Sequence, residues 1–139
     1  RILNNKSINP GFLLAVFLWP DVELTWNKNT KNIHPSTALN EAIDNTLLKQ
    51  SKIFPIQKRF AITMSEIWRL QPRFENLNPK RVHRLSKHPR FRAAYDFLLL
   101  RNLKDKALKN TASWWINFVE ADENKKNQLT HEHNFKENA

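Results

Sequence analysis

The sequence predicts an all-α fold, a compact bundle of about six helices punctuated by prolines. Only one of the 139 residues is glycine, whereas folds rich in tight hairpins or phosphate-binding loops need several. Leu, Ala and Lys are abundant, which favours helices. The seven prolines stand mostly at the edges of apolar segments, where helices begin or end. Apolar residues make up 40% of a chain long enough to bury the core of one domain.

The first helix is expected to open at Asn9-Pro10-Gly11 and to end at Trp19, because Pro20 follows. Its residues are apolar nearly all round, which indicates a buried helix. Residues 21–34 are polar and mixed.

Two more helices are expected before Pro72. One starts at His34-Pro35-Ser36, with Ser36 or Thr37 as its cap, and runs to about Lys52. Its apolar face consists of Ala38, Leu39, Ala42, Ile43 and Leu47. The next begins at Pro55, and Pro72 ends or kinks it. Its inward side chains are Ile56, Phe60, Met64, Ile67 and Trp68.

Three helices are expected in the C-terminal half. Asn78-Pro79 starts a short helix that reaches Lys87 and buries Val82 and Leu85. Pro89 starts the second, with the apolar stripe Phe91, Ala94, Tyr95, Leu98 and Leu99. The last spans roughly 106–120 and carries Leu108, Trp114, Trp115 and Phe118. Arg90 and Arg101, three turns apart, are expected to share another face of their helix. Residues 122–139 are expected to form a polar, disordered tail after a single domain over residues 1–121.

The net charge of +10 comes from one block of the chain. Residues 49–92 hold twelve Lys and Arg against two acidic residues, Glu66 and Glu75, whereas the remainder has eleven of each sign. A block of one sign attracts phosphate, so a polyanion is the first expected partner. The alternative is a solvated face that only confers solubility.

Basic side chains in this block are the candidate RNA contacts. They are Lys58, Arg59, Arg69, Arg73, Lys80, Arg81, Arg84, Lys87, Arg90 and Arg92. Lys80, Arg84 and Lys87 follow the spacing of one helical face, and two helix N-termini nearby add partial positive charge. Phe74 lies outside the apolar stripes and is the best candidate for an exposed ring, whereas Phe91, Tyr95 and the tryptophans fit the core. His83 and His88 could each add a phosphate donor, but a structural role fits them better.

Most catalytic chemistry is not expected in this chain. There is no cysteine, no Gly-Ser pair and no acidic pair on an apolar strand. Glu120, Asp122 and Glu123 fit a solvated cluster. His131-Glu132-His133 could chelate a metal, but two histidines without further ligands make a poor site. No metal site and no catalytic residue are therefore assigned.

The chain opens at Arg1 and its only methionine is Met64, so we expect a fragment of a longer protein. The longest apolar run has eight residues, far short of the roughly 20 that span a bilayer. No signal-peptide pattern is present, and a cytoplasmic setting fits the absence of cysteine.

Four segments together resemble the C-terminal region of the bacterial poly(A) polymerase I family. They are FPIQKRF (54–60), EIWRLQPRF (66–74), KRVHRLSKHPRFRAAYDFLLLR (80–101) and WWINF (114–118). Their order and spacing match over about residues 9–119, and HPRFRAAYDFLLLR followed by the tryptophan pair is the most specific element.

The resemblance implies a relative of the CCA-adding enzymes, which as a whole protein uses ATP and Mg²⁺ to add adenylates to RNA 3′ ends. The tail it makes promotes RNA decay. The family's catalytic Gly-Ser motif and paired aspartates belong to an N-terminal head, so this chain should not polymerise by itself. The family's C-terminal region is helical and basic and helps to hold RNA, so RNA is the expected partner of a monomeric chain.

Two other hypotheses stay open. The chain could be a structural or interaction module that braces the catalytic head or docks a protein of RNA decay. It could also bind DNA, although no short glycine-containing turn of a helix-turn-helix is evident.

Overall fold

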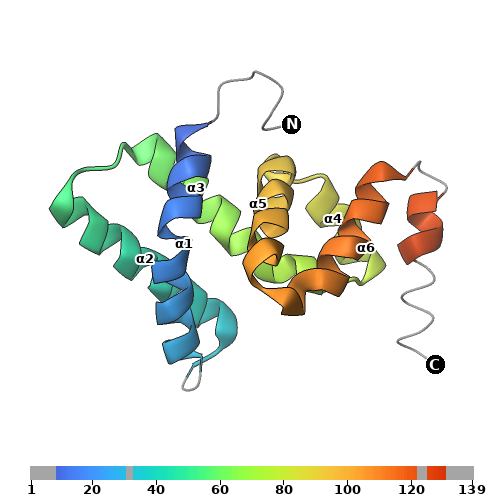
Figure 1. Cartoon of the computed structure of the whole chain (residues 1–139), viewed down its shortest axis with the longest axis horizontal. Coiled ribbons are helices and arrows are strands. Elements are labelled where there is room, and N and C mark those ends of the chain that lie inside the picture. The colour runs from blue at the N-terminus through green and yellow to red at the C-terminus, as the bar shows by residue number, and fades with distance from the viewer. Residues whose placement is uncertain (1–8, 31–32, 122–124, 131–139) are drawn as a thin grey trace. The chain divides into compact units, whose positions relative to one another are not determined.

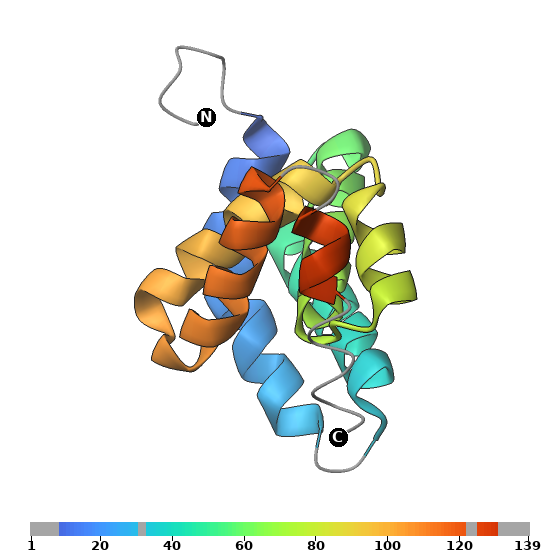
Figure 2. The same cartoon turned by 90° about the vertical axis from the view of Figure 1, so that its right-hand side faces the viewer.

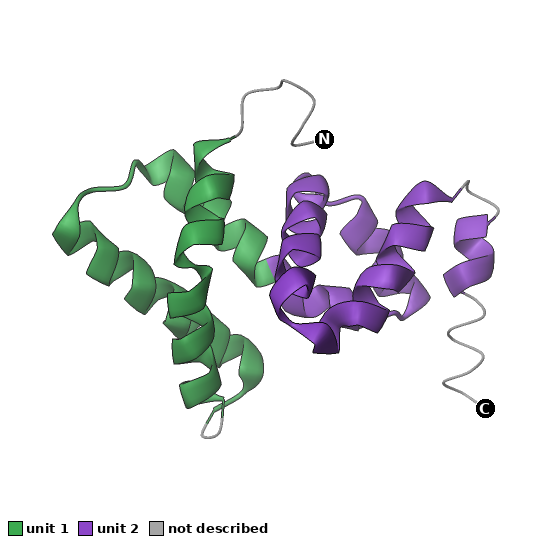
Figure 3. Ribbon diagram, in the orientation of Figure 1, with its two compact units in different colours: residues 1–69 green, residues 70–139 purple. Residues whose placement is uncertain are grey.

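The computed structural model describes residues 9–30, 33–121 and 125–130, and the chain divides into two compact units, residues 1–69 and 70–139 (Figure 3). All regular structure in these residues is helical, which confirms the all-α prediction (Figures 1 and 2). The elements in order are α1 (Pro10–Asn29), α2 (Pro35–Ile53), α3 (Lys58–Leu70), the 3-10 helix η1 (Gln71–Glu75), α4 (Pro79–Ser86), α5 (Phe91–Lys104), the 3-10 helix η2 (Lys106–Leu108) and α6 (Lys109–Glu120). Residues 125–130 are also helical. The expected single domain thus contains two units, and each is described by itself.

Helix α1 continues through Pro20, so the expected end at Trp19 is wrong. Its start is as predicted, since the Asn9 side chain accepts a hydrogen bond of 2.7 Å from the Gly11 amide. A proline inside a helix removes one backbone hydrogen bond and costs about 3 kcal/mol. Trp19 and Val22, on either side of the proline, are buried in unit 1, where α1 packs on α2. This burial holds the helix together across Pro20.

One side of α1 is apolar and exposed, so the prediction of a helix buried all round is also wrong. Its exposed side chains are Leu13, Val16, Phe17 and Leu24. They recur at helical spacing, and Phe17 is 78% exposed.

Helix α2 has the predicted extent and buries the predicted apolar face except Leu47, which is half-buried, and its cap is His34 rather than Ser36 or Thr37. The His34 backbone is not helical, and its ring Nδ1 accepts a hydrogen bond of 3.2 Å from the Ser36 amide. Pro35 can follow the cap directly because the first amide of a helix has no partner within it. The buried side chains of α2 are Ala38, Leu39, Ala42, Ile43 and Thr46.

Helix α3 begins at Lys58, three residues after the predicted start at Pro55. Phe54 is extended, as residues before proline usually are, and the first turn bonds to the Gln57 carbonyl. Trp68 is fully buried and donates a hydrogen bond of 3.2 Å from Nε1 to the carbonyl of Ala15. This bond ties α3 to α1 within unit 1.

The two helices approach closely at Gly11. A Cβ at this position would lie 3.0 Å from both Cβ and Cγ2 of Thr63 on α3. The single glycine of the chain therefore serves helix packing rather than a loop.

The core of unit 2 is aromatic and includes Phe74, so the prediction of an exposed Phe74 ring is wrong. Phe74 is 0% exposed and meets the ring of Trp115 edge-to-face at 5.2 Å. The Trp115 indole donates a hydrogen bond of 2.7 Å to the Phe74 carbonyl. Proline at position 72 turns the chain into η1, as predicted, and this turn carries Phe74 inward. The buried cluster consists of Leu70, Phe74, Val82, Leu85, Ala94, Tyr95, Leu98, Leu108, Trp115 and Phe118.

Arg101 does not share an open face with Arg90. It is only partly exposed, and its Nη1 donates a hydrogen bond of 3.1 Å to Gln71 Oε1. Gln71 is itself buried and donates from Nε2 to the carbonyl of Ala94 at 3.2 Å. Arg101 therefore belongs to the interior of unit 2.

The expected disordered tail is wrong for residues 125–130, which are helical. Leu129 packs against the core cluster of unit 2, and Thr130 is buried. Asp122, Glu123 and the predicted weak chelate His131-Glu132-His133 lie outside the described residues. Within the described ranges, no helix is long and apolar enough to cross a membrane.

Candidate nucleic-acid interface

Helix α4 and its C-cap residue carry four exposed cations, because the two apolar side chains of α4 turn to the core. Val82 and Leu85 are each 1% exposed, as predicted. The Asn78 side chain caps the helix by accepting a hydrogen bond of 3.0 Å from the amide of residue 80, and Pro79 occupies the first turn. The exposed cations are Lys80, Arg81, Arg84 and Lys87.

Three arginines of unit 2 meet around one hollow, which we call the arginine hollow. It is lined by Arg73 and Asn76 together with Arg81 and Arg84 of α4, and its volume is about 300 Å³. The Asn76 side chain accepts a hydrogen bond of 3.1 Å from the Asn78 amide, so its NH₂ group remains as a donor. Among the described residues, no carboxylate pairs with these three guanidinium groups. The three guanidinium groups and the Asn76 NH₂ group are hydrogen-bond donors, an arrangement that suits an oxyanion.

The structure groups the cations of α4 differently from the expected single face. Arg84 lies with Arg81 at the arginine hollow. Lys80 and Lys87 line a second cavity of unit 2. Helix α4 therefore presents two basic sides.

Arg92 and Arg90 already make contacts with neighbouring residues of unit 2. Arg92 lies 3.5 Å from the Asp96 carboxylate and 5.3 Å from the centre of the Tyr95 ring. Arg90 is partly buried, and its backbone amide donates a hydrogen bond of 3.0 Å to His88 Nδ1. His88 thus helps to shape the turn before α5, the structural role expected for it.

The remaining predicted contacts, Lys58, Arg59 and Arg69, belong to unit 1. Lys58 is exposed at the start of α3. Arg59 donates to Gln57 at 3.0 Å and lies 4.8 Å from the ring centre of Phe60. Arg69 donates to the Asn40 side chain of α2 at 2.9 Å. These residues are exposed, but they do not gather around one hollow as Arg73, Arg81 and Arg84 do.

Three residues that line these cavities were not predicted from the sequence. Asn76 had no signal beyond its place between Arg73 and Arg81. Lys126 and Asn127 line the second cavity but were assigned to the polar tail. A helical reading of residues 125–130, with Leu129 inward, would have placed them on the folded unit. Across the described residues, no three His, Asp or Glu side chains gather to hold a metal ion.

Comparisons with known proteins define the class of the chain. Residues 31–139 match the family model described as the polymerase A arginine-rich C-terminus. The chain belongs to this family, and the resemblance drawn from its motifs is confirmed.

Individual relatives carry the name poly(A) polymerase I. The one from Escherichia coli O6:H1 is 34% identical over 136 residues, which cover 93% of this chain and 29% of the relative. The Salmonella typhi protein is 33% identical over 122 residues, and the Haemophilus influenzae protein is 30% identical over 139 residues. Those matches cover 26% and 30% of the two relatives. The chain therefore spans less than a third of the relatives' length and corresponds to the C-terminal region of a poly(A) polymerase.

Proposed function

We propose that this chain holds RNA for a poly(A) polymerase by binding the phosphate backbone of a single strand. The observation that carries the proposal is the arginine hollow, where Arg73, Arg81 and Arg84 line one cavity without a carboxylate partner among the described residues. Guanidinium groups bind phosphate oxygens in pairs of hydrogen bonds, and each engaged phosphate releases counterions. Other exposed basic side chains would add phosphate contacts without reading sequence.

Catalysis belongs, in this proposal, to a part of the parent protein outside this chain. That part would bind ATP and Mg²⁺ and add adenylates to RNA 3′ ends. Non-specific contact suits such an enzyme because it must accept many different 3′ ends. The products would enter RNA decay, so decay proteins are candidate partners, and the cytoplasm is the expected location.

The test is binding of the 139-residue chain to a labelled single-stranded RNA, followed by fluorescence anisotropy at several salt concentrations. Affinity should fall steeply with salt. The triple variant Arg73→Ala/Arg81→Ala/Arg84→Ala should bind at least tenfold more weakly, and the slope of log affinity against log salt should shrink by about two.

The matched control is Lys104→Ala/Lys106→Ala/Lys109→Ala, which removes three exposed charges at the end of α5 and around η2. It should bind nearly as well as the unchanged chain. Equal losses of RNA affinity in both triple variants would show that the three arginines act only through net charge and that the hollow is not a specific phosphate site. Absence of RNA binding at low salt would refute the proposed function, and tighter binding to DNA of equal length would favour the DNA hypothesis.

A second candidate function is to brace the catalytic head. It is favoured by the exposed apolar side of α1, where Phe17 is 78% exposed. In this case the separately purified remainder of the parent should bind the chain, and Phe17→Asp should weaken that complex. The variant Asn45→Asp, at an exposed position of α2, adds the same charge as a control.

A further inference from the structure

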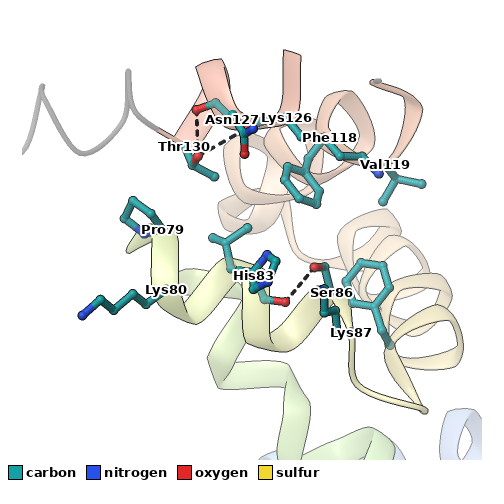
Figure 4. A pocket seen from close by; sticks show the side chains of 12 residues that line it. Pro79, Lys80, His83, Ser86, Lys87, Phe118, Val119, Lys126, Asn127 and Thr130 are labelled. Atoms are coloured by element: carbon teal, nitrogen blue, oxygen red, sulfur yellow. Dashed lines mark hydrogen bonds between the residues drawn. The ribbon is translucent and has the colours of Figure 1, made fainter. Parts of the chain in front are cut away.

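The second cavity of unit 2 is an open hollow, and it is lined by α4, α6, the helix of residues 125–130 and Phe91 of α5. It has a volume of about 500 Å³, within the range of pockets that bind small ligands. One wall comes from α4, another from α6, and the third from the helix of residues 125–130 (Figure 4). All of its lining residues belong to unit 2.

The floor of the cavity is apolar. Val82 of α4 and Phe118 and Val119 of α6 contribute to it. Phe118 is only 6% exposed, because its ring stacks on that of Trp114 and the Lys126 ammonium lies over it. The apolar surface that a ligand can reach therefore comes mainly from the half-buried Val119 and Phe91.

The rim of the cavity is basic. Lys80 belongs to α4 and Lys87 is its C-cap, and Lys126 lies with its Nζ 5.3 Å from the ring centre of Phe118. No acidic side chain is among the lining residues. The rim therefore favours a ligand with negative charge.

Of the four polar side chains considered in the lining, Ser86 and Thr130 are bonded within their own segments, and the His83 ring and the Asn127 amide remain available for a ligand. The Ser86 hydroxyl donates to the His83 carbonyl at 2.9 Å, and the Thr130 hydroxyl bonds to backbone carbonyls of its own helix (Figure 4). The His83 ring and the Asn127 amide have no partner among the described residues. Both can donate to and accept from the edge of a heterocycle.

We propose that this cavity takes one nucleoside monophosphate unit, present as an unstacked nucleotide of the bound RNA strand. The base would rest on the apolar floor with its edge at His83 and Asn127, and its phosphate would lie against the lysines of the rim. An apolar face, a hydrogen-bonding edge and a negative charge in one ligand are the properties of a nucleotide. The inference rests on the proposed RNA binding, to which it adds a contact with a base.

The test compares two strands of equal length and charge. One is an ordinary single-stranded RNA, and the other is abasic, so it keeps the phosphates but lacks the bases. The unchanged 139-residue chain should bind the ordinary strand about fivefold more tightly, because contacts of the base with the apolar lining add to the phosphate contacts. The arginine-hollow triple variant should weaken both strands by the same factor.

The decisive variant is Lys126→Ala/Asn127→Ala, which should bring the affinity ratio of the two strands close to one. Its control, Lys125→Ala/Gln128→Ala, removes the same groups from the same helix at positions that do not line the cavity, and it should keep the ratio. Because the first variant could loosen this helix, His83→Ala on the opposite wall serves as a second variant and should lower the ratio at least twofold.

The outcomes separate the two proposals. If the unchanged chain binds both strands equally, or the ratio survives in both cavity variants, the base pocket is refuted while RNA binding stands. If neither strand binds, the proposed function itself fails. A free nucleoside monophosphate should displace the strand only at far higher concentration. Displacement at equal concentration would assign the cavity to a free nucleotide and overturn its assignment to the strand.

Discussion

Gln71 is a polar side chain inside an apolar core, and its two ends join two parts of α5. Its amide nitrogen donates to the Ala94 carbonyl, and its oxygen accepts from Arg101. A buried amide is tolerated when its groups are bonded, and here both ends are. Arg101 thus has a structural partner, whereas the arginines of the hollow have no carboxylate partner among the described residues. Burial and partners, rather than residue type, distinguish the cations that are free for a ligand.

Ionisation of Tyr95 is expected to lower the folding stability at alkaline pH. Burial raises the pKa of its hydroxyl above the ordinary 10.0, an effect that the positive charge of Arg92 opposes. Above pH 10 the unfolded chain loses this proton while the folded chain keeps it, so folding stability falls as pH rises toward the folded pKa. The loss should not exceed about 1.4 kcal/mol per pH unit.

Chemical unfolding of the unchanged chain and of Tyr95→Phe, at pH 8 and pH 11, measures this contribution. Other groups titrate in both proteins, so the difference between them isolates the tyrosine. We expect the phenylalanine variant to lose less stability between the two pH values. An equal loss would show that ionisation of Tyr95 is not resisted by burial.

The helices differ in how much of their extent comes from local signals. Helices α1 and α4 each begin at an asparagine followed by proline, and these starts depend on local residues alone. The asparagine oxygen caps the first turn, and the proline fixes the φ angle of the first helical residue. The course of α1 through Pro20 depends on burial of Trp19 and Val22 against the rest of unit 1. Packing across a distance in sequence therefore overrides a strong local stop signal.

Replacing Pro20 measures how much the proline destabilises α1 against the packing that holds the helix together. Pro20→Ala restores a backbone donor inside α1 and removes the ring, so the free energy of unfolding of unit 1 should rise by about 1 to 3 kcal/mol. Urea unfolding followed by circular dichroism is the measurement. Pro55→Ala, outside any helix, should change stability by less than about 0.5 kcal/mol. A stability loss in Pro20→Ala would mean that the proline ring itself contributes to packing.

Two compact units share the functions proposed here unequally. The arginine hollow and the second cavity both lie in unit 2, which has its own aromatic core. Unit 1 contributes three of the ten predicted contacts and the exposed apolar side of α1. Binding of RNA and attachment to a larger protein could therefore be divided between the units.

Residues 70–139 expressed alone should fold and bind RNA. A buried cluster around Phe74 and Trp115 is enough for a cooperative thermal transition in a chain of this size. The affinity should depend on Arg73, Arg81 and Arg84 as it does in the 139-residue chain. Thermal unfolding by circular dichroism and the anisotropy titration test both statements. A folded segment without RNA affinity would place the binding surface in unit 1.

Local patterns were enough to predict the helical class, most helix starts, the basic block of residues 49–92 and the family. These features depend on spacing, capping and composition, which can be read without knowing what packs on what. Tertiary packing decided that Phe74 lies inside, that α1 passes Pro20, and that residues 125–130 join unit 2. It also brought Arg73 beside Arg81 and Arg84, because the turn after Pro72 lays η1 along α4. Burial and proximity arise between segments separated in sequence, and one-dimensional periodicity cannot assign them.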